Sequence, residues 1–203
     1  MSLFNVLTRF LHKLVPARIP VSGTIKCEVY GELDKVIAVL KEKLVEEKAR
    51  IVFDGGNTIR AVHGELKAYR PSYYKKYVTI TARKEGLRTI LNIHVDVKKY
   101  VFTWLTIDAV VLALGAYIAY SALAATLYMF NIVENMPLTP LSKYIIDVVG
   151  TSFLLDMMLV MSGLMILFTL LDIYPTLNAL KFSHNWVWEL VDRVKSIVEQ
   201  EKK

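Results

Sequence analysis

Several features that define other protein classes are scarce or missing in this 203-residue chain. Its single cysteine, Cys27, excludes a scaffold held together by disulfides. The 9 glycines and 6 prolines follow no period, which excludes a collagen-like fibre. The sequence contains no glycine-rich nucleotide loop, no HExxH zinc motif and no GxSxG nucleophile elbow. We therefore expect no enzyme activity, no cofactor and no metal site.

Charge is also scarce in two long segments in the second half of the chain. No Lys, Arg or His occurs between Lys99 and Lys143, and residues 109–130 carry no charge. A second apolar run covers residues 145–174. Three acidic residues interrupt this second run: Asp147, Asp156 and Asp172.

These apolar runs predict two membrane-spanning helices, because about 20 apolar residues cross the hydrocarbon core of a bilayer as a helix. We place the helices near residues 102–131 and 144–173. Pro137 and Pro140 lie in the short connection, so the two helices form a transmembrane hairpin over residues 100–175.

Basic residues flank only one side of this hairpin. The connection between the helices offers Lys143 alone, whereas several basic residues precede the first helix and follow the second. Lys and Arg concentrate on the cytoplasmic side of membrane proteins. We therefore predict a multi-pass protein of the cell membrane with both termini in the cytoplasm.

The remaining sequence predicts a small cytoplasmic α+β domain over residues 20–99. Residues 21–29 alternate between apolar and polar types, as in a half-buried strand, and residues 32–47 switch to helical spacing. Gly55-Gly56 between two strand-like runs is typical of a hairpin turn. Further strands are expected at 51–53, 58–63, 77–83 and 89–98. The predicted order is β-α-β-β-β-β.

Amphipathic helices flank these two parts of the chain. Residues 1–19 contain a short helix with an apolar face and a basic face, which suits a membrane interface or a docking surface. Residues 176–203 contain a longer amphipathic helix, which we expect to pack on the α+β domain or on another subunit. The fold class is therefore an α+β membrane protein.

Asp156 is the most distinctive candidate functional residue, because it is an acid near the centre of the second predicted membrane helix. Intramembrane acids usually face a protein interior or a water path. Helical spacing places Asp156 on one face with Ser152, and antiparallel pairing brings it near Tyr120 and Tyr117 of the first helix. A proton relay and an interhelical polar contact are both open, and we favour the polar contact because a single acid makes a poor relay.

The first predicted membrane helix has two different faces. One contains Gly115, Ala119 and Ala122, small residues that permit close approach of another helix, as Gly163 does on the second. The other face is rich in tyrosine. Because one hairpin partner covers only one face, we expect contacts with other membrane subunits or with a second copy.

A basic segment precedes the first membrane helix. Residues 55–99 contain ten Lys or Arg residues against three acids. Such a segment suits anionic lipid headgroups near a membrane, and nucleic acid is the less favoured partner. The candidate surface residues are Lys67, Arg70, Lys75, Lys76, Arg83, Lys84, Arg88, Lys98 and Lys99.

Three functions are compatible with this sequence. The favoured one is a non-catalytic accessory or structural subunit of an integral membrane complex. The alternatives are a membrane-anchored module that binds lipid or another ligand, and a proton-coupled transport component that uses Asp156. Neither predicted membrane helix contains His or Cys, which argues against a haem or copper centre. The scarcity of Cys and Gln favours a thermophilic source.

Overall fold

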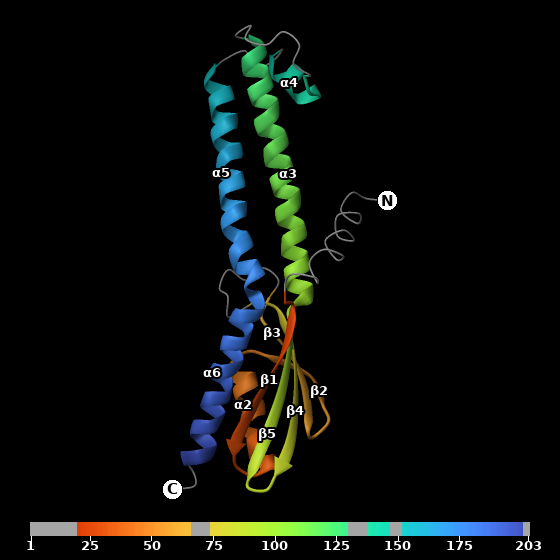
Figure 1. Ribbon diagram of the computed structural model, residues 1–203, viewed down its shortest axis with the longest axis vertical. Coiled ribbons are helices and arrows are strands. Elements are labelled where there is room, and N and C mark those ends of the chain that lie inside the picture. Colours follow the sequence, from red (N-terminus) through yellow and green to blue (C-terminus); the bar gives the residue numbers. More distant parts are fainter. Residues whose placement is uncertain (1–19, 66–73, 130–137, 147–151, 201–203) are drawn as a thin grey trace. The chain divides into compact units, whose positions relative to one another are not determined.

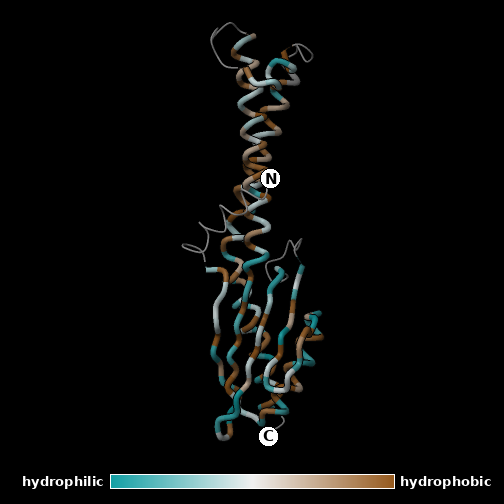
Figure 2. Tube along the Cα trace, turned by 90° about the vertical axis from the view of Figure 1, so that its right-hand side faces the viewer, coloured by the Kyte–Doolittle hydropathy of each residue, from teal (hydrophilic) through white to brown (hydrophobic). Residues whose placement is uncertain are grey.

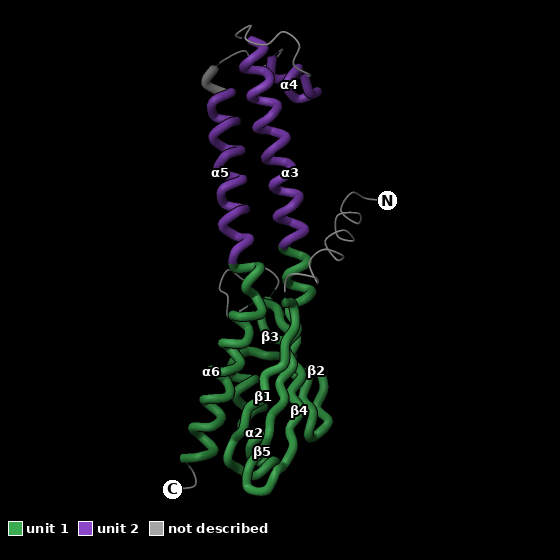
Figure 3. The backbone as a smooth tube through the Cα atoms, in the orientation of Figure 1, with its two compact units in different colours: residues 1–104, 175–203 green, residues 105–174 purple. Residues whose placement is uncertain are grey.

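The computed structural model describes residues 20–65, 74–129, 138–146 and 152–200 (Figure 1). The amphipathic helix expected within residues 1–19 lies outside them. The chain divides into two compact units (Figure 3). The first comprises residues 1–104 and 175–203, and the second comprises residues 105–174.

The first unit contains a five-stranded antiparallel sheet. Its strands are β1 (Ser22–Tyr30), β2 (Arg50–Asp54), β3 (Thr58–His63), β4 (Lys76–Glu85) and β5 (Arg88–Asp96). They lie in the order β1-β5-β4-β3-β2, and helix α2 (Leu33–Glu46) joins the two edge strands. The predicted β-α-β-β-β-β order is confirmed.

Two helices cover one face of this sheet. Helix α6 (Ala179–Gln200) contacts β1 and β5, and α2 contacts α6 and three of the strands. Alternate strand residues supply the covered core, and Figure 2 shows the alternation of hydrophobic and hydrophilic positions along the strands. The register aligns Ile80 with Ile59 on one side and with Ile93 on the other, and all three are buried. The opposite face of the sheet carries polar and charged residues, as expected for an antiparallel sheet with one open face.

Two glycines in and next to β1 allow α6 to approach the sheet closely. A Cβ atom added at Gly23 would lie 2.7 Å from the His184 ring, and one added at Gly31 would clash with the Val198 side chain. A side chain at either position would force the α6 side chain that it meets to move. The two glycines therefore leave room for α6 side chains against β1.

The second unit is a hairpin of two long apolar helices. Helix α3 (Lys98–Met129) begins four residues before its predicted start, and α5 (Ser152–Leu177) begins later than expected. A separate short helix, α4 (Pro140–Tyr144), ends at the residue where the second predicted helix begins. Thr139 caps α4 by accepting a hydrogen bond from the Ser142 N–H. By length and composition, α3 and α5 are both able to cross a membrane.

Helix α5 ends shortly after Pro175, which lies within its last turn. Proline cannot donate the helical hydrogen bond, and its ring disfavours continuation of the helix through this position. The helix runs two residues further, to Leu177, and α6 begins after the single residue Asn178. The predicted boundary near Pro175 is therefore displaced by only a few residues.

Candidate functional site

The contact between α3 and α5 is built on small side chains that recur every seven residues. In α3 these positions include Gly115 and Ala122, both buried. A Cβ atom at Gly115 would lie 3.0 Å from the Ile166 side chain, so this glycine permits close contact with α5. Ala122 is fully buried in a cluster with Leu155 of α5. These residues thus lie on the predicted packing face of α3.

The other two residues assigned to helix packing lie differently. Ala119 is half-buried beside this seam. Gly163 is exposed, and a Cβ atom added there would meet nothing within 4 Å among the described residues. Gly163 therefore belongs to the outer surface of α5. The buried residues among the described side chains of this helix are Leu155, Ser162, Thr169 and Thr176.

Hydroxyl side chains in the hairpin bond to the backbone of their own helix. Ser162 donates to the Leu159 carbonyl at 2.9 Å, and Thr169 donates to the Met165 carbonyl at 2.7 Å. These bonds satisfy the hydroxyls without a partner from the other helix. Small polar residues can therefore line the seam at little cost in an apolar setting.

The tyrosine-rich face of α3 is partly covered by the segment that contains α4. Ser121 is fully buried, and its Oγ lies 2.8 Å from Thr139 Oγ1. Tyr117, Tyr120 and Tyr128 remain 42%, 38% and 44% exposed. Less than half of the surface of each of these tyrosines is therefore exposed.

Asp156 lies on the outer surface of the hairpin. It follows Leu155, which is buried in the seam, and its own side chain is exposed. The side chain of Ser152, predicted to share its face, lies outside the described part of the structure. The predicted contact between Asp156 and Tyr120 remains a prediction.

The acidic residue that the hairpin does bury is Asp108. Its side chain is only 4% exposed, and it lies one seven-residue repeat before Gly115. Asp108 is not among the site residues predicted from the sequence. The signal that could have identified it is its spacing, since Asp108, Gly115 and Ala122 share one helical face.

The predicted basic surface does not form one patch. Arg83, Lys84 and Arg88 flank the turn between β4 and β5, whereas Lys98 and Lys99 follow the opposite end of β5. A nine-residue strand rises about 3.3 Å per residue, so the two groups are separated by roughly 25 Å. Lys75 is half-buried, and Lys67 and Arg70 lie outside the described residues.

Lys76 departs furthest from its expected place on the surface. It is fully buried, because it occupies the same phase of β4 as Val78 and Ile80, which face the helices. His63 lies directly opposite it on β3 and is 2% exposed. A lysine in this position cannot contact a lipid headgroup.

Trp186 of α6 connects these two buried basic side chains. The Lys76 Nζ lies 4.4 Å from the centroid of the Trp186 ring, a cation–π geometry, and the His63 ring stacks on the same indole at 4.3 Å. The indole N–H donates to Glu47, at the end of α2, at 3.3 Å. Arg193 of α6 forms an ion pair with the same carboxylate. We call these five residues the Trp186 cluster.

Burial perturbs the titration of this cluster. It lowers the pKa of Lys76 to about 7, although the charges of Glu47 and Glu189 act in the opposite direction. Burial and then the charge of Lys76 lower the pKa of His63 to about 4. Burial alone would raise the pKa of Glu47, but hydrogen bonds from Arg193 and Trp186 lower it. The cluster thus favours a neutral His63 and an ionised Glu47 at neutral pH.

Cys27 offers no reactive thiol. It is buried in β1, its Sγ lies 3.7 Å from the Leu91 carbonyl oxygen, and burial raises its pKa to about 11. A thiol with a raised pKa is a poor nucleophile. No group of three His, Cys, Asp or Glu residues that could hold a metal ion occurs within the described residues.

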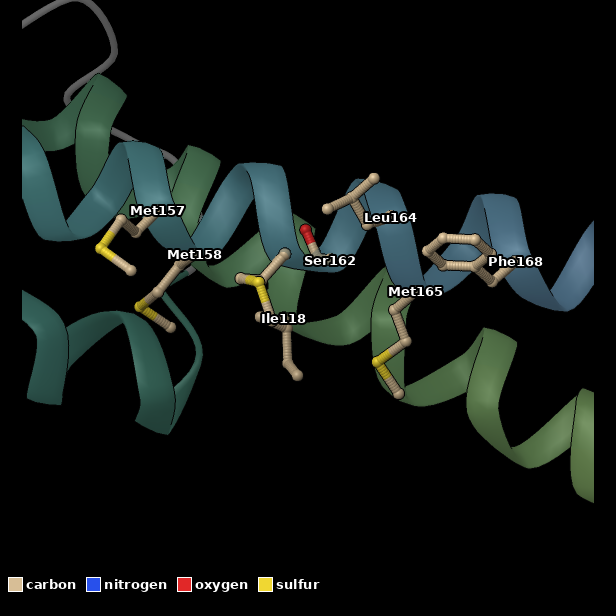
Figure 4. A pocket seen from close by; sticks show the side chains of 8 residues that line it. Ile118, Met157, Met158, Ser162, Leu164, Met165 and Phe168 are labelled. Atoms are coloured by element: carbon tan, nitrogen blue, oxygen red, sulfur yellow. The ribbon is translucent and has the colours of Figure 1, made fainter.

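A methionine-rich groove runs along the hairpin (Figure 4). It has a volume of about 510 Å³, and Ser162 is the polar side chain among its lining residues. Its walls are formed by Ile118, Met157, Met158, Met161, Ser162, Leu164, Met165 and Phe168. Because Ser162 bonds to its own helix, the groove offers an apolar and adaptable surface.

No known family model, curated protein or solved structure matches this chain.

Proposed function

We propose that this chain is a non-catalytic accessory or structural subunit of an integral membrane complex. The observation that carries the proposal is the poor burial of its apolar helices. In the most apolar 18-residue window of each helix, the buried share is 28% for α3 and 11% for α5. A core helix of a soluble protein is mostly buried, so lipid or other helices are needed to cover these surfaces.

The outer surface of α5 supports lateral packing against another membrane helix. Met161 and Phe168, which line the groove described above, are 61% and 65% exposed. The groove of Figure 4 lies along this helix and is lined by four methionines, whose flexible side chains adapt to a partner. A partner helix that packs here would bury the exposed apolar surface without any polar contact.

The start of α3 carries residues suited to a membrane interface. Lys98 and Lys99 are exposed, and the Lys98 Nζ lies 6.0 Å from the centroid of the Phe102 ring. Lys and Arg concentrate at the cytoplasmic ends of membrane helices, so these two lysines support a cytoplasmic position for the sheet unit.

Membrane insertion and orientation are tested with single cysteines in a Cys27→Ser background. Thr24, exposed on β1, and Lys143, exposed on α4, are each replaced by Cys. With an impermeant maleimide, we expect Lys143→Cys to react in intact cells and Thr24→Cys to react only after lysis. Equal labelling of both before lysis, or release of the chain by alkaline carbonate, contradicts the proposal.

Association is tested by purification in mild detergent followed by native mass spectrometry. Met161→Trp narrows the groove, and Val160→Trp is its control because both native residues are 61% exposed. We expect a complex that Met161→Trp weakens several-fold and Val160→Trp leaves unchanged. A monomer without partners would refute the accessory role.

A further inference from the structure

The methionines of this chain are concentrated in one short stretch of α5. Of the 7 methionines in the sequence, four lie within residues 157–165, and the other three lie outside this helix. All four line the groove of Figure 4. The groove therefore gathers four thioether sulfur atoms, from Met157, Met158, Met161 and Met165.

Met161 occupies the centre of this group. Side chains three or four positions apart on a helix are neighbours, with Cβ atoms about 5–6 Å apart. Met157 and Met158 precede Met161 by four and three positions, and Met165 follows it by four, so all three are its neighbours. Figure 4 shows Met157 and Met158 towards one end of the groove and Met165 further along α5. Because methionine is unbranched and has three rotatable bonds, the sulfur atoms can turn towards a common point.

The groove offers very few other ligand atoms beside these sulfurs. Ser162 is the polar side chain of its lining, and the Ser162 hydroxyl donates to the Leu159 carbonyl at 2.9 Å. Zinc and other divalent ions prefer thiolate, imidazole or carboxylate ligands, which the lining lacks. Thioether sulfur is a soft, neutral ligand that favours copper(I). The scarcity of His and Cys in the apolar helices does not weigh against such a site, because thioether ligation needs neither residue.

We propose that these four methionines form a binding site for copper(I), centred on Met161. The groove has a volume of about 510 Å³, which leaves room for the ion and for the side chains that turn towards it. All four ligands belong to one helix. The inference therefore goes beyond the accessory role proposed above and does not depend on a partner subunit.

Asp156 is suited to balance the charge of the bound ion. A positive charge among apolar side chains is costly unless a negative charge lies near it. Asp156 directly precedes Met157, its side chain is exposed, and it is the one charged residue of the sequence between Asp147 and Asp172. Its carboxylate supplies the counter-charge beside the groove. The site thus accounts for an acid in the middle of an otherwise apolar run.

The experiment measures metal binding by the full chain in mild detergent. Every protein carries Cys27→Ser, so that no thiol competes for the metal. Silver(I) nitrate, a source of an air-stable soft monovalent ion, is titrated in chloride-free buffer. Copper(I) is then measured by competition with bicinchoninic acid under a reductant. We expect one ion per chain, and X-ray absorption at the copper edge should show sulfur ligands.

Single substitutions assign the ligands. Met161→Leu removes the central sulfur but conserves the volume and apolar character of the side chain. It should weaken copper(I) binding by about tenfold or more, because the loss of even an outer partner of a metal site costs this much. Its association in native mass spectrometry should persist, since the groove stays apolar. Asp156→Asn should weaken copper(I) binding several-fold without changing the stoichiometry. Met129→Leu is the matched control, because Met129 does not line the groove, and it should bind like the parent protein.

The inference is overturned if neither silver(I) nor copper(I) binds at one ion per chain. It is also overturned if Met161→Leu binds copper(I) as tightly as Met129→Leu, or if zinc(II) binds as tightly as copper(I). An unchanged affinity in Asp156→Asn would refute the counter-charge assigned to this residue.

Discussion

Replacement of Lys76 by methionine should stabilise the sheet unit at neutral pH. The side chain is fully buried, and burial lowers its pKa from 10.5 to about 7. This difference corresponds to a cost of about 4 kcal/mol for the folded state at pH 7. The variant also loses the cation–π contact with Trp186, which contributes about 2 kcal/mol when desolvated. Methionine preserves the apolar packing, so the expected net gain is about 2 kcal/mol.

The pH dependence gives this prediction a sharper signature. Between the folded pKa of about 7 and the unfolded value of 10.5, the unfolded chain keeps a proton on Lys76 that the folded chain has lost. Stability of the wild type therefore rises with pH across this window, by about 1.4 kcal/mol per unit. The Lys76→Met variant lacks this contribution, so the stability difference between the two proteins should shrink and then reverse as the pH rises.

The assay is urea unfolding of the full chain in mild detergent, followed by tryptophan fluorescence at several pH values. Lys84→Met is the control, because Lys84 lies on the same strand but is exposed. Its unfolding free energy should follow that of the wild type. The reasoning is refuted if Lys76→Met is less stable at pH 7 and its pH profile runs parallel to the wild-type profile.

Two further predictions concern the packing of α6 on the sheet. Burial lowers the pKa of His63 from 6.5 to about 4, so wild-type stability should fall by about 1.4 kcal/mol per unit as the pH drops through this window. His63→Phe should remove that dependence in the same urea assay. The prediction is wrong if the unfolding free energy of this variant falls at acid pH as steeply as that of the wild type. Gly31→Ala introduces a Cβ into the Val198 side chain and should destabilise the unit by about 1–3 kcal/mol. A melting temperature equal to that of the wild type would show that α6 can shift without cost.

Much of the fold could be predicted from local patterns, because strands and helices impose different periods on the sequence. The alternation in residues 22–30 and the helical spacing in 33–46 correspond to β1 and α2. The order of the strands in the sheet could not be read in this way. It depends on which edges pair across long sequence separations, and local alternation contains no information about the partner.

The Trp186 cluster shows the same limit at the level of side chains. Lys76 was assigned to the surface because its neighbours in sequence are basic, although its phase with Val78 and Ile80 indicates burial. The phase was therefore the more informative signal for this residue. The contact between Glu47 and Trp186 joins positions 139 residues apart, and no local spacing predicts it. Only the packing of α6 against the end of α2 brings the two together.

In the hairpin, the buried acidic residue is not the one that the sequence pattern singled out. A charge at the centre of an apolar run attracts attention, yet Asp156 is exposed while Asp108 is buried. Depth along a helix and burial between helices are independent quantities, because the first follows from position in the sequence and the second from helical phase. Asp108 shares its phase with Gly115, where a side chain would touch the partner helix. An acid at that phase must be compensated within the protein, whereas an acid on the outer face can be compensated by whatever surrounds the hairpin.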